Sequence, residues 1–161
     1  MIPDIDVSVT LTSRLRLAQA LKKAGINDPA TVARLTVAGT LTEEDFEYIY
    51  DNMRETLHEL DMGSVWVKKN EIPYDAFCYC TGLTSITLPN SVTEIGAYAF
   101  EDCTGLAFIT FPPSMKKIGE GAFRACTDLT SITLPDSVTE IGECAFSLCT
   151  GLASITLPDS V

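Results

Sequence analysis

A unit of 23 residues occurs four times, without insertion or deletion, in the C-terminal 90 residues of this chain. The copies start at Ile72, Ile95, Ile118 and Ile141. A fixed period of about 20 to 50 residues predicts a stack of similar supersecondary units, each covering the next. Each copy has a Phe at its sixth position, a Cys at its ninth and a Leu at its twelfth (Phe77, Phe100, Phe123, Phe146; Cys80, Cys103, Cys126, Cys149; Leu83, Leu106, Leu129, Leu152).

The second half of each unit predicts a short strand. Ile86 and Leu88 are two residues apart, so in an extended strand both face the core, while Ser85 and Thr87 face outward. With Leu83 they define a spacing of apolar residues at relative positions 1, 4 and 6. Strands of successive copies should lie side by side in parallel. A proline ends each strand, because proline cannot donate to the ladder (Pro89, Pro112, Pro135, Pro158).

The first half of each unit predicts a turn, or a single helical turn, around a pair such as Ala99-Phe100. Its Phe, Ala and Ile side chains should stack into ladders of like residues. A serine follows each strand at a position where its hydroxyl can satisfy backbone groups of the local turn (Ser91, Ser114, Ser137, Ser160).

Two degenerate units precede the regular ones. The 1-4-6 spacing recurs in two earlier sets of residues, at intervals of 25 and 26 residues, which makes six rungs in total (Val32, Leu35, Val37; Leu57, Leu60, Met62). Between them, Thr42 to Asp45 forms a capping signal, and apolar residues at helical spacing follow (Phe46, Ile49, Tyr50, Met53). A helix on the convex side is therefore expected here.

The N-terminal segment predicts a cap for the open end of the stack. Residues 13–25 have the pattern of an amphipathic helix that ends at Gly25, and Asp28-Pro29 opens a second short turn. We therefore expect an N-terminal helical cap in residues 1–31, two degenerate rungs with a convex helix in 32–71, and four 23-residue repeats in 72–161, the last one truncated.

The repeat pattern IGxxAFxxCTxLxxITLPxSVTE resembles the BspA-like repeats of the leucine-rich repeat superfamily over residues 72–161. It departs from the common leucine-rich consensus in having Ser where an Asn ladder is expected after the strand. The resemblance implies an α/β solenoid: a right-handed coil with a parallel sheet on one face and an N-terminal helical cap. It also implies a protein at the cell surface or secreted, attached to host proteins or to other bacteria.

Composition and charge exclude several classes of function. The chain has 161 residues, of which 46% are hydrophobic, enough for a real core. Its net charge of −11 repels phosphate backbones and anionic membrane surfaces, so nucleic acid is not an expected partner. No apolar stretch is long enough to span a membrane. The start, Met1 to Asp6, lacks a leader pattern, which leaves a cytoplasmic protein and a removed leader as open readings.

The residues that could carry chemistry fit the repeat better than they fit an active site. Four of the six cysteines belong to the ninth-position ladder and predict reduced, structural thiols, while Cys78 and Cys144 have no zinc spacing. The only histidine, His58, is expected on the solvated surface. Neither a nucleophile-base pair nor a phosphate loop is present. A weak calcium site at Glu94, Asp136 and Glu140 lacks clustered oxygen ligands. We expect no enzyme, no metal and no cofactor.

The leading hypothesis is a non-catalytic protein-protein interaction module that uses the outer face of the strands. The second copy breaks the pattern, because Phe108 replaces the outward Ser, Pro113 replaces Asn or Asp, and Lys116-Lys117 replace Thr-Glu. An exposed aromatic side chain can anchor an interface, although drift without function remains the plainer reading. The candidate partner-binding residues are Phe108, Ser85, Thr87, Thr110, Ser131, Thr133, Lys116 and Lys117.

The expected partner is a host extracellular protein or a bacterial surface protein. The last rung, with Leu152, Ile155 and Leu157, has no following rung in this sequence, so either the natural protein continues or two copies meet end to end. The alternative to an interaction module is a scaffold segment of a larger surface protein, whose adhesive or active domain lies beyond Val161.

Overall fold

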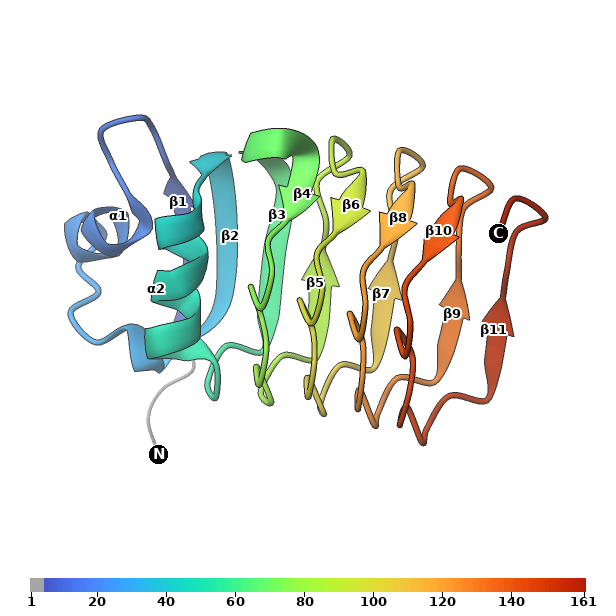
Figure 1. Ribbon diagram of the computed structural model, residues 1–161. Helices are drawn as coiled ribbons and strands as arrows, with labels where there is room; N and C mark the ends of the chain where they lie inside the picture. The colour runs from blue at the N-terminus through green and yellow to red at the C-terminus, as the bar shows by residue number, and fades with distance from the viewer. Residues whose placement is uncertain (1–4) are drawn as a thin grey trace.

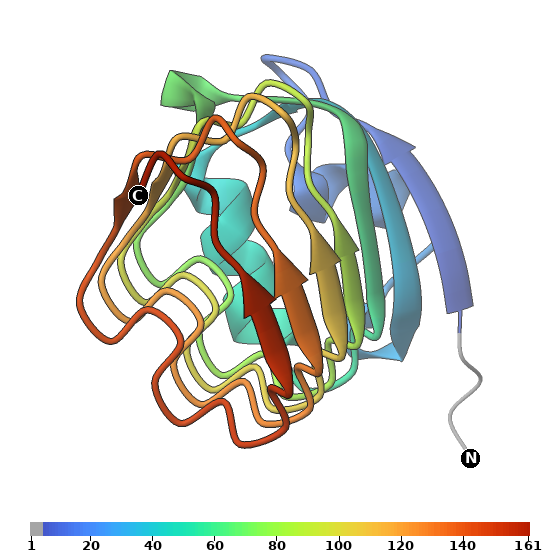
Figure 2. The ribbon, with the colours of Figure 1, turned by 90° about the vertical axis from the view of Figure 1, so that its right-hand side faces the viewer.

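The chain coils into an elongated stack of turns that lie side by side (Figure 1). The structure is a computed structural model and describes residues 5–161. A view along the stack shows that each repeat makes one turn of the coil, with the longer strands on one side (Figure 2). This arrangement confirms the expected α/β solenoid. Residues 1–4, where the leader pattern was sought, lie outside the described residues.

The longer strands form a parallel row. Five of them are hydrogen-bonded in the order β1-β2-β3-β5-β7, and β9 and β11 form a separate pair. The pairing places Leu35, Leu60, Ile86 and Ile109 in one register, and Ile132 opposite Ile155. The bounds of these strands are β1 Ile5–Thr10, β2 Val32–Leu41, β3 Glu59–Val67, β5 Ser85–Thr87, β7 Phe108–Thr110, β9 Ser131–Thr133 and β11 Ser154–Thr156.

A second parallel sheet, which the sequence did not predict, runs along another side of the coil (Figure 2). Its strands contain two residues each, so they are too short to leave an alternating pattern in the sequence. The expectation of a sheet on one face only was therefore incomplete. The four strands pair in sequence order: β4 Glu71–Ile72, β6 Glu94–Ile95, β8 Lys117–Ile118 and β10 Glu140–Ile141.

The N-terminal segment contains a strand in addition to the helix that was expected. It begins with the strand β1, which pairs in parallel with β2 and places Val7 opposite Leu35 and Val9 opposite Val37. The helix α1 covers Leu17–Lys23 and a 3-10 turn, η1, covers Pro29–Thr31. The alternation of apolar and polar residues in 5–10 was the signal for the missed strand. The division of the chain at residues 31 and 71 stays a prediction.

The convex helix α2 covers Glu43–Met53 and begins where the capping signal placed it. The backbone N–H of Thr42 donates to Asp45 at 3.0 Å, and the Asp45 carboxylate also accepts from the backbone N–H of Leu17 at 2.8 Å. Arg16 pairs with the same carboxylate at 2.9 Å. The buried charge of Asp45 therefore joins the beginnings of both helices.

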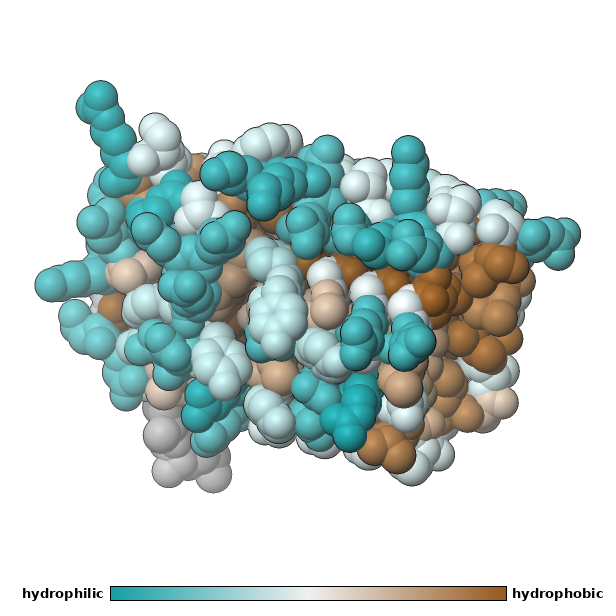
Figure 3. Space-filling view, in the orientation of Figure 1, coloured by the Kyte–Doolittle hydropathy of each residue, from teal (hydrophilic) through white to brown (hydrophobic). Residues whose placement is uncertain are grey.

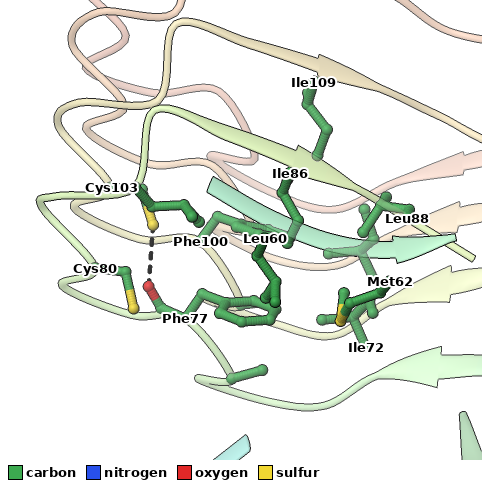
Figure 4. Close-up of a cluster of buried hydrophobic side chains, with 14 of the residues drawn as sticks. Leu60, Met62, Ile72, Phe77, Cys80, Ile86, Leu88, Phe100, Cys103 and Ile109 are labelled. Carbon is green, nitrogen blue, oxygen red and sulfur yellow. Dashed lines mark hydrogen bonds between the residues drawn. The ribbon is translucent and has the colours of Figure 1, made fainter. Parts of the chain in front are cut away.

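Stacked phenylalanine rings fill the core of the regular repeats, as the repeated sixth position predicted. Phe77 and Phe100 have ring centroids 5.1 Å apart, as have Phe100 and Phe123, and Phe123 and Phe146 are 5.5 Å apart. The pairs are close to parallel, with interplanar angles of 18°, 3° and 8°. Figure 4 shows Phe77 and Phe100 packed among aliphatic side chains of several rungs.

The ladder cysteines are buried beside these rings and link successive repeats. The thiol of Cys103 donates to the carbonyl of Phe77 at 3.0 Å (Figure 4). Cys126 and Cys149 repeat the contact with Phe100 and Phe123, at 3.1 and 3.0 Å. Burial raises the pKa of Cys80 to about 12, so its thiol stays protonated at neutral pH. All six cysteines are free, in agreement with a structural thiol ladder.

The serines after the strands bond the preceding repeat and not their own turn, which corrects the expectation. The single hydroxyl hydrogen of Ser114 is shared between the carbonyls of Asn90 at 2.7 Å and Val92 at 2.6 Å. Ser137 donates to Met115 and Ser160 to Asp136 in the same way. Ser91 is the equivalent serine of the first repeat, and its hydroxyl has no hydrogen-bond partner in the described residues. We call these four equivalent serines the serine column. The serine column thus stabilises the stacking of the regular turns.

The turns of the repeats are not helical. Each has two residues in the left-handed region, with φ between 55° and 61° (Asp75, Tyr98, Gly121, Cys144; Tyr79, Asp102, Ala125, Leu148). Backbones of successive turns also approach closely, because a Cβ on Gly119 would lie 2.6 Å from the backbone nitrogen of Ala97. The glycine after the first Ile of the second, third and fourth repeats (Gly96, Gly119, Gly142) therefore permits these turns to stack at the sheet spacing.

Candidate partner-binding surface

Two rows of outward side chains run along the β5, β7, β9 and β11 strands. Strand pairing places Ser85 beside Phe108 and Thr87 beside Thr110. It also places Ser131 beside Ser154 and Thr133 beside Thr156. All are exposed apart from Ser85, which is half-buried. Six of the eight candidate residues, Phe108, Ser85, Thr87, Thr110, Ser131 and Thr133, therefore lie on the outer faces of neighbouring strands.

Phe108 is the one aromatic side chain in these two rows on the four short strands. It is 60% exposed, although Ile109, the next residue, is buried. The hydrogen-bonded row of strands is interrupted beside it, because β7 ends one sheet and β9 begins another. A flanking bond from Thr130 to the carbonyl of Ala107, at 3.3 Å, still connects the two rungs.

The same face is charged at its N-terminal end, which the sequence analysis missed. Arg34 on β2 pairs with Asp6 on β1 at 3.1 Å and with Glu59 on β3 at 3.0 Å. These carboxylates raise the pKa of Arg34, and the hydrogen bond to Glu59 makes the largest contribution. Glu59 in turn lies beside Ser85, and Asp61 beside Thr87. The signal in the sequence was the position of Arg34 and Glu59, each directly before a core leucine of a degenerate rung.

The two candidate lysines do not join this surface. Lys117 belongs to β8 in the second sheet, where it lies between Glu94 on β6 and Glu140 on β10. Its ammonium group is 3.1 Å from Glu94 and 3.6 Å from Glu140. Lys116, directly before it, is exposed. The structure therefore separates Lys116 and Lys117 from the face that carries Phe108.

This arrangement also removes the calcium hypothesis. Glu94 and Glu140 flank a lysine and do not converge on an empty space, and the described part of the chain has no group of three or more metal-ligating side chains. His58 is half-buried and not freely solvated, because its Nδ1 lies 3.0 Å from the carbonyl of Gly82. It contributes to the contact between a degenerate rung and the first regular one.

Comparison with known families agrees with this geometry. A family described as BspA type leucine-rich repeat region (6 copies) matches residues 70–161, more than half of the chain. The chain belongs to the BspA-type leucine-rich repeat family. The match begins two residues before Ile72, the start of the first regular repeat, and it supports a repeat module for protein interaction. No curated protein matches the chain.

Solved structures of bacterial leucine-rich repeat proteins share the fold. A leucine-rich repeat protein of T. pallidum is 28% identical, with a TM-score of 0.57, over 95% of this chain and 59% of its own. A leucine-rich cell surface protein of Faecalibacterium prausnitzii is 28% identical, with a TM-score of 0.54, over 81% of this chain and 34% of its own. A protein from Bacteroides ovatus, 22% identical, aligns at a TM-score of 0.61 over 96% of this chain and 38% of its own, and shows the fold alone.

The chain thus spans 59%, 34% and 38% of the lengths of these three neighbours. Among residues 5–161, no helix of this BspA-type protein has the length and apolar character needed to cross a membrane.

Proposed function

We propose that this BspA-type repeat is a non-catalytic binding module that contacts a protein partner through the outer face of β5, β7, β9 and β11. The observation that carries the proposal is the exposure of Phe108 among short hydroxyl side chains. A large apolar ring left in water on a regular polar surface is unfavourable in isolation, and it becomes favourable when a partner covers it.

The neighbours of Phe108 suit such a contact. Ser85, Thr110 and Ser131 carry short, uncharged side chains that can donate or accept hydrogen bonds and that lose little conformational entropy on binding. Aromatic residues surrounded by contacts of this kind are common centres of binding energy. The paired charges of Arg34, Asp6 and Glu59 would form the rim of the interface.

The partner that we propose is a host extracellular protein or a protein on another bacterial surface, met at the cell surface or after secretion. The family membership supports this setting, and the Faecalibacterium neighbour is itself named as a cell surface protein. The acidic net charge of −11 argues against nucleic acid. The alternative, a scaffold segment of a larger surface protein, stays a prediction.

We further propose self-association through the rung that carries β11. Ile155 and Leu157 are exposed, whereas Ile132 and Leu134, at the same positions one repeat earlier, are buried under the next rung. Figure 3 shows hydrophobic side chains gathered at this end of the molecule. A second copy could cover them end to end.

The Phe108→Ser substitution tests the main proposal. It restores the residue of the other copies, so the fold should be kept, and the affinity for a partner captured from host extracellular proteins or bacterial surface extracts should fall about tenfold or more. Binding would be measured by surface plasmon resonance with the captured partner. Leu148→Ser is the matched control, since Leu148 is 56% exposed, close to the 60% of Phe108, but lies in a turn. Equal affinity of the Phe108 variant and the parent would refute the proposal.

A further inference from the structure

A cleft of about 790 Å³ lies on the side of the molecule that carries α2. One wall is formed by α2 and the other by the turn of the first regular repeat, residues 73–79. Figure 3 shows this side, where near-neutral side chains lie among hydrophilic ones between the helix and the repeats. Its volume falls within the range of about 300 to 1,000 Å³ that is usual for ligand sites.

The cleft results from a change in the backbone between two rungs. The degenerate rung uses the 11-residue helix α2 on its convex side, whereas the next rung uses a compact turn. The two shapes do not fill the same space. Phe46 on the helix packs edge-on against Phe77 at 5.6 Å and closes the contact beneath.

Three tyrosines line the cleft: Tyr50 from α2, and Tyr74 and Tyr79 from the turn. Tyr74 is 64% exposed and Tyr79 is 51% exposed, so both rings are accessible to a ligand. The guanidinium of Arg54 already lies 5.0 Å from the centre of the Tyr50 ring. The charge of Asp75 raises the pKa of Tyr74, so this phenol is neutral at physiological pH.

The carboxylates of the cleft outnumber its cationic groups. Glu43, Glu47 and Asp51 are spaced four residues apart, so they occupy one face of α2, where like charges at this spacing destabilise a helix. Glu71 and Asp75 add two carboxylates from β4 and the turn, against Lys68 and Lys69. Within residues 5–161, none of these five carboxylates makes an ion pair. Glu43 lies in the first turn, where the helix dipole favours a negative charge, so the unpaired repulsion falls mainly on Glu47 and Asp51.

We propose that this cleft binds an arginine- or lysine-containing segment of a partner polypeptide. A guanidinium or ammonium group would lie over the exposed tyrosine rings and pair with the carboxylates of α2. The ligand would relieve the repulsion along the helix, which an uncharged ligand could not do. This site is separate from the Phe108 surface, because its residues come from α2, from the segment 68–71 and from the 73–79 turn.

The test uses the full chain and two labelled peptides in low salt. One peptide has four arginines separated by glycines, and the other has citrulline, a neutral isostere, at the same four positions. The arginine peptide should bind saturably in fluorescence anisotropy, the citrulline peptide at least about tenfold more weakly, and the difference should shrink as salt rises. Equal binding of both peptides would overturn the proposal.

Paired variants locate the binding. Glu47→Gln with Asp51→Asn should weaken the arginine peptide about four- to tenfold, and Tyr74→Ala about two- to fivefold. Asp136→Asn with Glu143→Gln removes the same charge from exposed sites outside the cleft and should leave affinity within about twofold. Phe108→Ser should also leave it unchanged.

Two results would contradict the cationic ligand. If the distant pair of variants weakens the peptide as much as the cleft pair, the attraction is only that of the net charge. The second result is that the neutral oligosaccharide cellopentaose binds the cleft and displaces the arginine peptide. If the Glu47 and Asp51 substitutions leave the affinity for this sugar unchanged, the cleft is a carbohydrate site in which the tyrosine rings stack on the sugar. Amide chemical shifts of α2 and residues 73–79 distinguish both results from specific peptide binding.

Discussion

Lys117 stands in a column of the second sheet whose other members are Glu71, Glu94 and Glu140. Adjacent members of such a column lie about 4.8 Å apart along the sheet. Four glutamates there would repel one another, because like charges directly opposite each other destabilise a sheet. The lysine of the irregular copy instead pairs with a neighbour on each side. What reads in sequence as drift thus has a structural effect.

Replacing Lys117 by glutamate should lower the thermal unfolding midpoint, because it removes two ion pairs and places four carboxylates in one column. The groups are exposed, so the decrease should be modest and should shrink at a salt concentration of about 1 M. Circular dichroism at low and high salt would measure it. Lys116→Glu changes the net charge equally without breaking an ion pair, and equal midpoints for the two variants would contradict the prediction.

At the scale of the element, the regular repeats are joined by ladders of like residues more than by long strands. The strands β5, β7, β9 and β11 have three residues each and those of the second sheet have two. Successive repeats are also held together by stacked phenylalanine rings, by thiols bonded to carbonyls of the preceding repeat, and by serine hydroxyls. Each ladder contact joins a residue to the rung before it, so damage at one rung weakens its two neighbours.

Phe100→Ala should therefore lower the free energy of unfolding by about 3 to 5 kcal/mol, since the ring is fully buried between Phe77 and Phe123. Phe108→Ala, in the same repeat, should change stability by less than about 0.5 kcal/mol, because its ring is mostly in water. Urea titration of both variants would measure the difference. A large loss for Phe108 would show that its ring supports the fold.

At the scale of the whole molecule, the two ends of the stack differ. The first described rung is covered by α1, whose Leu17, Ala20 and Leu21 are buried. At the other end, Ile155 and Leu157 are exposed at positions that are buried in the preceding repeat. The face of Phe108 and the cleft beside α2 lie between these ends and differ in chemistry.

The exposed rung predicts self-association that depends on concentration. Leu157→Lys should shift the chain toward the monomer in sedimentation velocity, because a charge would replace an exposed apolar side chain of the proposed contact. Thr156→Lys adds the same charge on the outer face of β11 and should leave the equilibrium unchanged. A parent chain that stays monomeric at millimolar concentration would refute the prediction.

The sequence by itself determined the coil, the strand register and the core ladders. A strict period places Phe77 and Phe100 at equivalent points of successive turns, and alternation around Ile86 sets which side is buried, so neither depends on distant contacts. The beginning of α2 was equally local, because the Thr42-Asp45 cap is formed by neighbouring residues.

Only the tertiary structure decided which side chains of neighbouring rungs lie next to each other where the rungs differ in shape. It separated Lys117 from Phe108, joined Arg34 to Asp6 and Glu59, and opened the cleft between α2 and the 73–79 turn. The strand β1 and the two-residue strands of the second sheet form because a neighbouring rung supplies their partners. These features depend on contacts between rungs, whose geometry no single repeat encodes.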